Sequence, residues 1–191
     1  MEQIYVRDKT FNRTDFRKDL LLQGEYDHCT FSNCNLSSVD LSGIKFSDCE
    51  FLACDLSLAN LTKTALRNIT FKDCKMLGLK FESCNEFGLA FDLENCNLNH
   101  SSFYQIKLKK TEFKNTQLQE VDFTECDLTG SILSNCDFAK STFYNTILEK
   151  ADFRTSYNFS IDPEVNRIKK AKFSIQGLAG LLDKYDIQID L

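Results

Sequence analysis

Several residue types that shape ordinary globular proteins are scarce in this sequence of 191 residues. It contains no Trp, one Pro, two His and seven scattered Gly. No apolar run approaches the roughly 18 residues that a membrane-spanning helix needs, and the first ten residues lack the basic and then apolar pattern of a secretory signal. We therefore expect a cytoplasmic protein that does not associate with a membrane.

The chain also lacks an excess of basic residues. Its 28 Asp and Glu outnumber its 23 Lys and Arg, so the formal net charge is -5. Because affinity for nucleic acid depends on neutralising phosphates with Lys and Arg, we expect no direct nucleic-acid binding. A nucleophile elbow, a Gly-rich phosphate loop and a paired-His motif are missing as well, so we expect no catalytic residues and no cofactor.

What the sequence has in abundance is Phe, with 17 residues, and a period of five. Large apolar residues recur at every fifth position from Phe11 to Phe81 and, after a slip of two residues within 82–92, from Leu93 to Phe153. Five residues of α-helix turn through about 500°, and odd steps along a flat strand alternate between faces. Neither element keeps this set on one side, so we predict a short extended segment and a corner in each repeat.

Four such corners close one coil of about 20 residues, and coils can then pair backbone to backbone. Residues 20 apart become vertical neighbours, and in several such columns the sequence repeats the same residue type. The matched columns are Phe11, Phe31, Phe51 and Phe71; Phe103, Phe123 and Phe143; and Leu108, Leu128 and Leu148. We predict an all-β solenoid of about seven coils with these columns in its core.

Eight of the nine Cys lie two residues before an apolar position of this series, and Cys84 takes the same place if the first register is carried one step past Phe81. Free buried Cys behaves as a small hydrophobe, so we predict interior packing for them. No two Cys are closer than five residues, which argues against a zinc site, and an odd number without an export signal argues against disulfides. His28 and His100 fall at outward corners without a ligand partner in the pattern, and we expect no metal site.

The two ends depart from the repeat. Residues 1–10 are predicted to be out of register and to cap the first coil, residues 11–158 to form one solenoid domain with a register break at 82–92, and residues 159–191 to form a small helical C-terminal cap. Asp162 and Pro163 suit the start of a short helix over 161–173. A second helical pattern follows Ser174.

The apolar stripe of this last segment has two interpretations that the sequence leaves open. It is either a lid over the final coil, as solenoids require, or a two-fold dimer contact in which residues 186–189 pair as an edge strand. The residues predicted for the contact are Ile175, Leu178, Ala179, Leu182, Ile187 and Ile189.

Outward charge is uneven along the chain. Residues 82–137 hold ten acidic residues against four Lys, and residues 119–137 hold five carboxylates without a base. Carboxylates on a stiff rod can stand in for a duplex, which carries one charge per about 1.7 Å of axis; the alternative is an ordinary solvated face. The predicted partner-binding residues are Asp92, Glu94, Glu112, Glu120, Asp122, Glu125, Asp127, Asp137 and Asp152.

Repeats such as CDLSL (54–58), ANLTK (59–63), CDLTG (126–130) and ADFRT (151–155) resemble those of the pentapeptide-repeat proteins. The stretches at 71–81, 97–108, 157–174 and 181–187 are similar to the branch with McbG, AlbG and Qnr-type members. The resemblance implies a right-handed quadrilateral β-helix and a homodimer formed through the C-terminus. It also implies binding to DNA gyrase or topoisomerase IV as a DNA mimic, with protection from quinolone, microcin or albicidin-type poisons. A generic scaffold for another protein partner stays open as the alternative.

Overall fold

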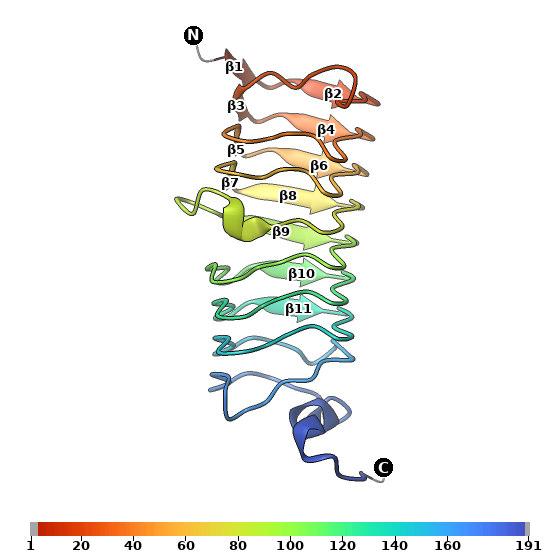
Figure 1. Ribbon diagram of the computed structural model, residues 1–191, viewed down its shortest axis with the longest axis vertical. Helices are drawn as coiled ribbons and strands as arrows, with labels where there is room; N and C mark the ends of the chain where they lie inside the picture. Colours follow the sequence, from red (N-terminus) through yellow and green to blue (C-terminus); the bar gives the residue numbers. More distant parts are fainter. Residues whose placement is uncertain (1–3, 190–191) are drawn as a thin grey trace.

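The structure is a computed structural model and describes residues 4–189. The chain winds into a tall stack of coils with the two ends of the chain at opposite ends of the stack (Figure 1). Each strand is only three or four residues long because a corner follows it. The strands are β1 (Ile4–Arg7), β2 (Thr10–Asn12), β3 (Gly24–Asp27), β4 (Thr30–Ser32), β5 (Lys45–Ser47), β6 (Glu50–Leu52), β7 (Ala65–Arg67), β8 (Ile69–Lys72), β9 (Phe91–Glu94), β10 (Glu112–Lys114) and β11 (Ile132–Ser134).

The strands form two parallel sheets on neighbouring sides of the stack. One has the order β1-β3-β5-β7 and the other the order β11-β10-β9-β8-β6-β4-β2. Pairs such as Phe11 with Phe31 and Phe31 with Phe51 lie 20 residues apart. The predicted coil length and register are therefore confirmed.

The coil has four faces, which we number in the order in which the chain visits them. Face 1 is the four-stranded sheet, continued by the bridges Lys107–Asp127–Ile147–Arg167. Face 2 is the seven-stranded sheet, continued to Asp152 and Lys172. Face 3 is the column of bridges from Asp15 to Tyr157, and face 4 includes the bridges from Lys80 through Ser102 and Asp122 to Thr142.

The predicted Phe columns fill the interior. Phe31, Phe51 and Phe71 are at most 1% exposed. The ring centroids are 4.7 Å apart between Phe31 and Phe51 and 5.1 Å apart between Phe51 and Phe71, and both pairs are stacked. All nine Cys are buried and free, as predicted. Seven of the thiols contact main-chain carbonyls of the coil: Cys54 Sγ, for example, lies 3.3 Å from the oxygen of Phe31.

Corners are made by residues with positive φ at every fifth position, including Asn95, Asn115 and Asn135. Asn tolerates this left-handed conformation better than most residues. These three side chains also hydrogen-bond along the corner, because the amide of Asn115 donates to Asn95 at 3.0 Å and that of Asn135 donates to Asn115 at 3.1 Å. The same side chains therefore turn the chain and tie successive coils together.

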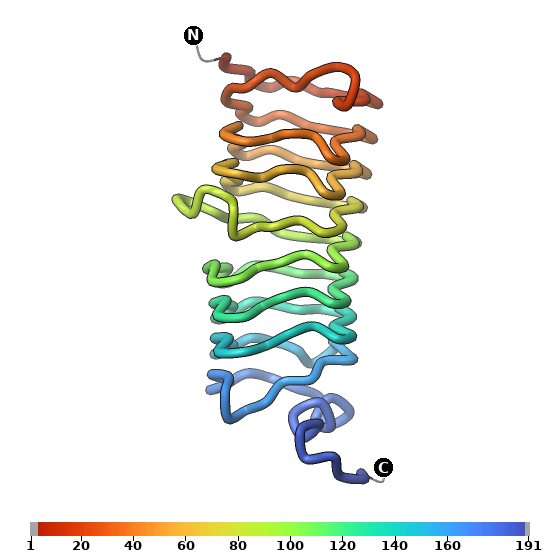
Figure 2. Tube along the Cα trace, viewed as in Figure 1, coloured from red at the N-terminus to blue at the C-terminus, as the bar shows by residue number. Residues whose placement is uncertain are grey.

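The register break lies where the sequence places it. A 3-10 turn, η1 (Phe81–Ser83), lies at its start, and Ile69 pairs with Phe91, 22 residues away. The two extra residues bulge from face 1, because the amides of Asn85 and Ala90 still bond to the carbonyls of Thr64 and Leu66. The chain between them projects from the stack (Figure 2).

Both expectations for the ends need correction. Residues 4–10 are not out of register, since Ile4 pairs with Gly24 and Thr10 with Thr30 at the usual spacing. Residues 1–3 of the predicted cap lie outside the described residues. The apolar Val6 side chain packs against the core, which is why this segment continues the coil.

The predicted helix over 161–173 is wrong, because Arg167 and Lys172 pair with Ile147 and Asp152 as a further rung. The second predicted helix reduces to two 3-10 turns, η2 (Leu178–Leu181) and η3 (Asp183–Tyr185). Gly180 there lies so close to Phe159 that an added Cβ would come within 2.2 Å of its carbonyl oxygen. Within residues 4–189 no helix has the length and apolar character to cross a bilayer.

Candidate partner-binding surface

The predicted acidic residues do not form one row but occupy all four faces. Asp92, Glu94, Glu112 and Asp152 lie on face 2. The others come from consecutive repeats and follow the coil around the rod: Glu120 at the corner of faces 3 and 4, Asp122 on face 4, Glu125 at the next corner, Asp127 on face 1 and Asp137 on face 3.

Two of the face 2 carboxylates are neutralised. Glu94 contacts Lys114 Nζ at 2.8 Å and Lys72 Nζ at 3.2 Å, and these hydrogen bonds hold the pKa of Glu94 below its usual value. Asp152 pairs with the Arg154 guanidinium at 2.7 Å, which lowers the pKa of Asp152 to about 2. Both groups therefore stabilise the rod locally.

Asp92 and Glu112 differ from these two. They occupy adjacent rungs of face 2, and the carboxylate of Asp92 accepts a hydrogen bond from the Glu112 amide at 2.8 Å. No Lys or Arg among residues 4–189 lies within ion-pair distance of either one. Like charges that face each other across neighbouring strands are destabilising, so this pair leaves negative charge available on face 2.

A second unneutralised group lies on the far side of the rod. Asp122 accepts a bond from the Thr124 amide, and Glu125 accepts one from Gln105, both at 2.8 Å. Neither carboxylate has an ion-pair partner in the part of the chain that the structure describes. Glu120 beside them is only loosely paired, with His100 at 3.2 Å and Lys140 at 3.9 Å. We call Glu120, Asp122 and Glu125 the acidic belt.

The side chains of Asp127 and Asp137 are occupied by contacts within the fold. Asp127 is 8% exposed; burial raises its pKa, but hydrogen bonds from Thr129 and Lys109 outweigh that effect and hold the pKa below its usual value. Asp137 is bonded by Gln119 at 2.6 Å and Asn158 at 2.8 Å. Neither side chain has much capacity left for a partner.

The C-terminal segment leaves its apolar residues exposed. Ile175 is 77% exposed, and Leu178, Leu182, Ile187 and Ile189 are exposed too, as is Ala179. Among the described residues 174–189, which we call the C-terminal segment, Leu181 alone packs against the core. The segment therefore covers the last coil incompletely and presents an apolar surface at one end of the rod.

Phe87, which the period of five does not single out, is 79% exposed. It lies in the loop that projects from face 1, where the Arg67 guanidinium lies 5.5 Å from its ring centroid. The register slip marks this loop in the sequence, but the period does not show that the extra residues point a Phe outward.

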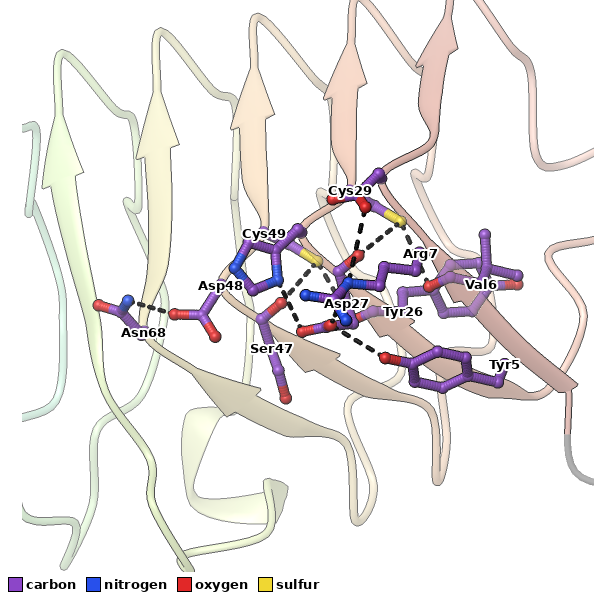
Figure 3. A network of polar contacts seen from close by, with 12 residues as sticks. Tyr5, Val6, Arg7, Tyr26, Asp27, Cys29, Ser47, Asp48, Cys49 and Asn68 are labelled. Carbon is purple, nitrogen blue, oxygen red and sulfur yellow. Dashed lines mark hydrogen bonds and ion pairs between the residues drawn. The ribbon is translucent and has the colours of Figure 1, made fainter.

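One cluster combines possible metal ligands. Ligand atoms of Asp27, His28 and Asp48 lie within 4.8 Å of one another. Figure 3 shows, however, that Tyr5 and Arg7 converge on Asp27, at 3.0 Å and 3.3 Å. Because Asp27 also bonds His28 at 2.9 Å, the cluster is accounted for as an ion-pair network of the first coils.

A filled parallel β-solenoid of this kind belongs to the class of solenoid repeat proteins. The sequence model of the pentapeptide repeat region matches residues 24–91 and 80–153. The chain belongs to the pentapeptide-repeat family.

Solved structures with the same fold include three of QnrB1, a plasmid-mediated fluoroquinolone resistance protein. Two trypsin-treated forms are 19% and 18% identical, with TM-scores of 0.62 and 0.63; coverage is 98% of both chains in the first comparison and 100% of both in the second. The full-length form is 18% identical with a TM-score of 0.51, over 96% of this chain and 100% of the other. No curated protein matches the sequence significantly. At these identities the likeness establishes the fold alone.

Proposed function

We propose that this protein is a non-catalytic ligand of a type II topoisomerase, DNA gyrase or topoisomerase IV, and protects that enzyme from a poison. In this proposal it occupies a surface that otherwise holds duplex DNA. The observation that carries the proposal is the acidic belt, where Asp122 and Glu125 present charge that no cation of the described residues neutralises. The pair of Asp92 and Glu112 on face 2 offers a second such surface.

Two further features support the proposal. Stacked aromatic rings fill the interior of the coils, which leaves no room there for a substrate. Binding would therefore take place on the outer faces. The fold is also that of QnrB1, which is described as a fluoroquinolone resistance protein. A stiff rod with fixed carboxylates presents its charges without ordering flexible chains, which reduces the entropic cost of binding.

We also propose that the protein acts as a homodimer joined through the C-terminal segment. Ile175, Leu178 and Ile187 expose apolar side chains at one end of the rod, and an apolar surface of this kind is typical of a contact site. A two-fold contact there would place two rods end to end and double the length of charged surface.

The test is gyrase supercoiling with purified protein, in the presence and absence of a quinolone, albicidin or microcin B17. We expect the wild-type protein to restore supercoiling in the presence of at least one poison. The variant D122N/E125Q should lose this effect if the belt binds the enzyme, and D92N/E112Q should lose it if face 2 does.

The matched control is D40N/D48N, which removes the same charge near the N-terminal end of the rod. It should behave as wild type. If the wild-type protein changes neither supercoiling nor poisoning for either enzyme, the topoisomerase proposal is wrong, and a scaffold for another protein becomes the preferred function. Loss of activity in all three variants would contradict the assignment to particular carboxylates.

A further inference from the structure

Five lysines of the C-terminal half lie along one edge of the rod. Lys110, Lys150 and Lys170 have positive φ and form the corner between faces 1 and 2, whereas Lys107 begins the column of bridges on face 1. Lys169 precedes Lys170 in the chain. We call these five residues the lysine edge; all five are exposed.

Two carboxylates of face 1 near this edge are already paired with other cations, whereas Glu112, two residues after Lys110 at the start of β10, has no Lys or Arg of residues 4–189 within ion-pair distance. Asp127 contacts Lys109 at 3.1 Å, and Glu149 contacts the Arg167 guanidinium at 2.6 Å. The five lysines of the edge have no ion-pair partner among residues 4–189. The edge therefore carries five uncompensated positive charges although the whole chain has a net charge of -5.

The spacing of these charges follows from the coil. Residues 107–110 and 167–170 are separated by three coil rises, or about 14 Å at the spacing of paired strands. Five charges over that length correspond to about one per 3 Å, and one strand of a duplex presents one phosphate per about 3.4 Å of axis. Gly130 fills the corner between Lys110 and Lys150 with positive φ and no side chain, which leaves the edge open.

The residue composition of the lysine edge favours nucleic acid over protein as its partner. The cores of protein interfaces are apolar or aromatic and depleted in Lys. On this edge Ile147 is half-buried and Ile168 packs against the core, so neither presents a fully exposed apolar side chain beside the lysines. Phosphate recognition needs only cations, and lysine is a common ligand of phosphate.

We infer that the lysine edge binds the phosphate backbone of duplex DNA without sequence preference. Toward the N-terminus the charge of this corner becomes negative, because Asp8 and Asp48 occupy the equivalent positions. Contact with DNA is therefore confined to the C-terminal half of the rod. The acidic belt lies on other faces of that half. Because phosphates repel carboxylates, the rod would turn its lysine edge toward the DNA. This inference uses different residues from the proposed function and stands independently of it.

The test is fluorescence anisotropy of a labelled duplex of about 20 base pairs with the full-length protein, at salt concentrations from about 50 to 150 mM. Five phosphate contacts predict a slope of log affinity against log salt of about -4.5, or a loss of about a hundredfold across this range. The variant K107Q/K110Q/K150Q removes three contacts, so its slope should fall to about -1.8.

The control K63Q/K80Q/K140Q removes three exposed lysines elsewhere and changes the net charge equally. It should keep the wild-type slope, and circular dichroism should show that both variants are folded. Absence of duplex binding at low salt, or equal weakening by the control, would overturn the inference. Tighter binding to poly-glutamate would reassign the edge to an acidic protein segment, and tighter binding to vesicles with anionic lipid would reassign it to a membrane surface.

Discussion

Removal of one ring from the Phe column tests the physical basis of the fold most directly. Phe51 is 1% exposed, and its ring stacks on Phe31 at 4.7 Å and on Phe71 at 5.1 Å. Phe46 also meets it edge-on at 5.4 Å. Phe51→Ala therefore breaks three aromatic contacts and opens a cavity between two coils.

The expected loss is large relative to the stability of a domain. Phe→Ala in a core costs about 3 to 5 kcal/mol, and this figure includes the ring contacts, which are worth about 0.5 to 1.5 kcal/mol each. A domain of ordinary stability has only about 5 to 15 kcal/mol in total. With a urea m-value of about 2 kcal/mol/M, a loss of about 4 kcal/mol moves the unfolding midpoint down by about 2 M.

The assay is urea unfolding followed by far-UV circular dichroism. Glu50→Ala is the matched control, because Glu50 precedes Phe51 in strand β6 but is exposed, and its midpoint should stay near that of the wild type. Phe51→Asp should prevent folding, since a buried carboxylate finds no partner in the column. If Phe51→Ala leaves the midpoint unchanged, the ring columns do not hold the coils together and the reasoning fails.

Three further predictions concern other parts of the rod. The Arg154 hydrogen bonds lower the pKa of Asp152 to about 2, so this pair stabilises the fold above about pH 4 and its contribution is lost as the pH falls toward 2. The difference in urea midpoint between wild type and Asp152→Asn should therefore be present at neutral pH and disappear near pH 2. Burial raises the pKa of Cys49 to about 12, so Ellman's reagent should label the folded protein slowly and all nine thiols rapidly in urea; rapid labelling without urea would contradict burial. Leu178→Glu should convert a dimer to a monomer in light scattering, whereas Leu20→Glu, at an exposed apolar position near the other end, should not; a dimer that survives Leu178→Glu would contradict the C-terminal contact.

The sequence predicts the core of this fold because one local period determines every coil. The step of five fixes which side chains point inward, and the sum of four steps fixes which residues stack, as the pairing of Phe31 with Phe51 confirms. The same step reaches Val6 from Phe11, so the first rung at Ile4–Arg7 was available from the sequence.

The C-terminus shows why a local pattern is insufficient. Asp162 and Pro163 favour a helix start, but the last coil offers unpaired backbone groups, and the amides of Arg167 and Lys172 bond to Thr146 and Ala151 at 3.0 Å and 2.8 Å. Tertiary hydrogen bonding therefore overrides the local helical preference. In the described residues after the final rung, the chain forms the 3-10 turns η2 and η3 instead of a helix.

The charged surface was harder to predict, because charges that are neighbours in sequence lie on different faces. Lys107 and Lys110 lie within the acidic stretch 82–137 in sequence, yet in the fold Lys107 lies on face 1 and Lys110 at its corner with face 2, while Asp122 lies on face 4. Charge in a solenoid must be summed down each column, since residues 20 apart are vertical neighbours. Summed in this way, the C-terminal half presents an acidic belt on one side and a lysine edge on another. A net charge of -5 therefore excludes neither an enzyme that recognises acidic surfaces nor a phosphate backbone, because each partner meets only the face that it contacts.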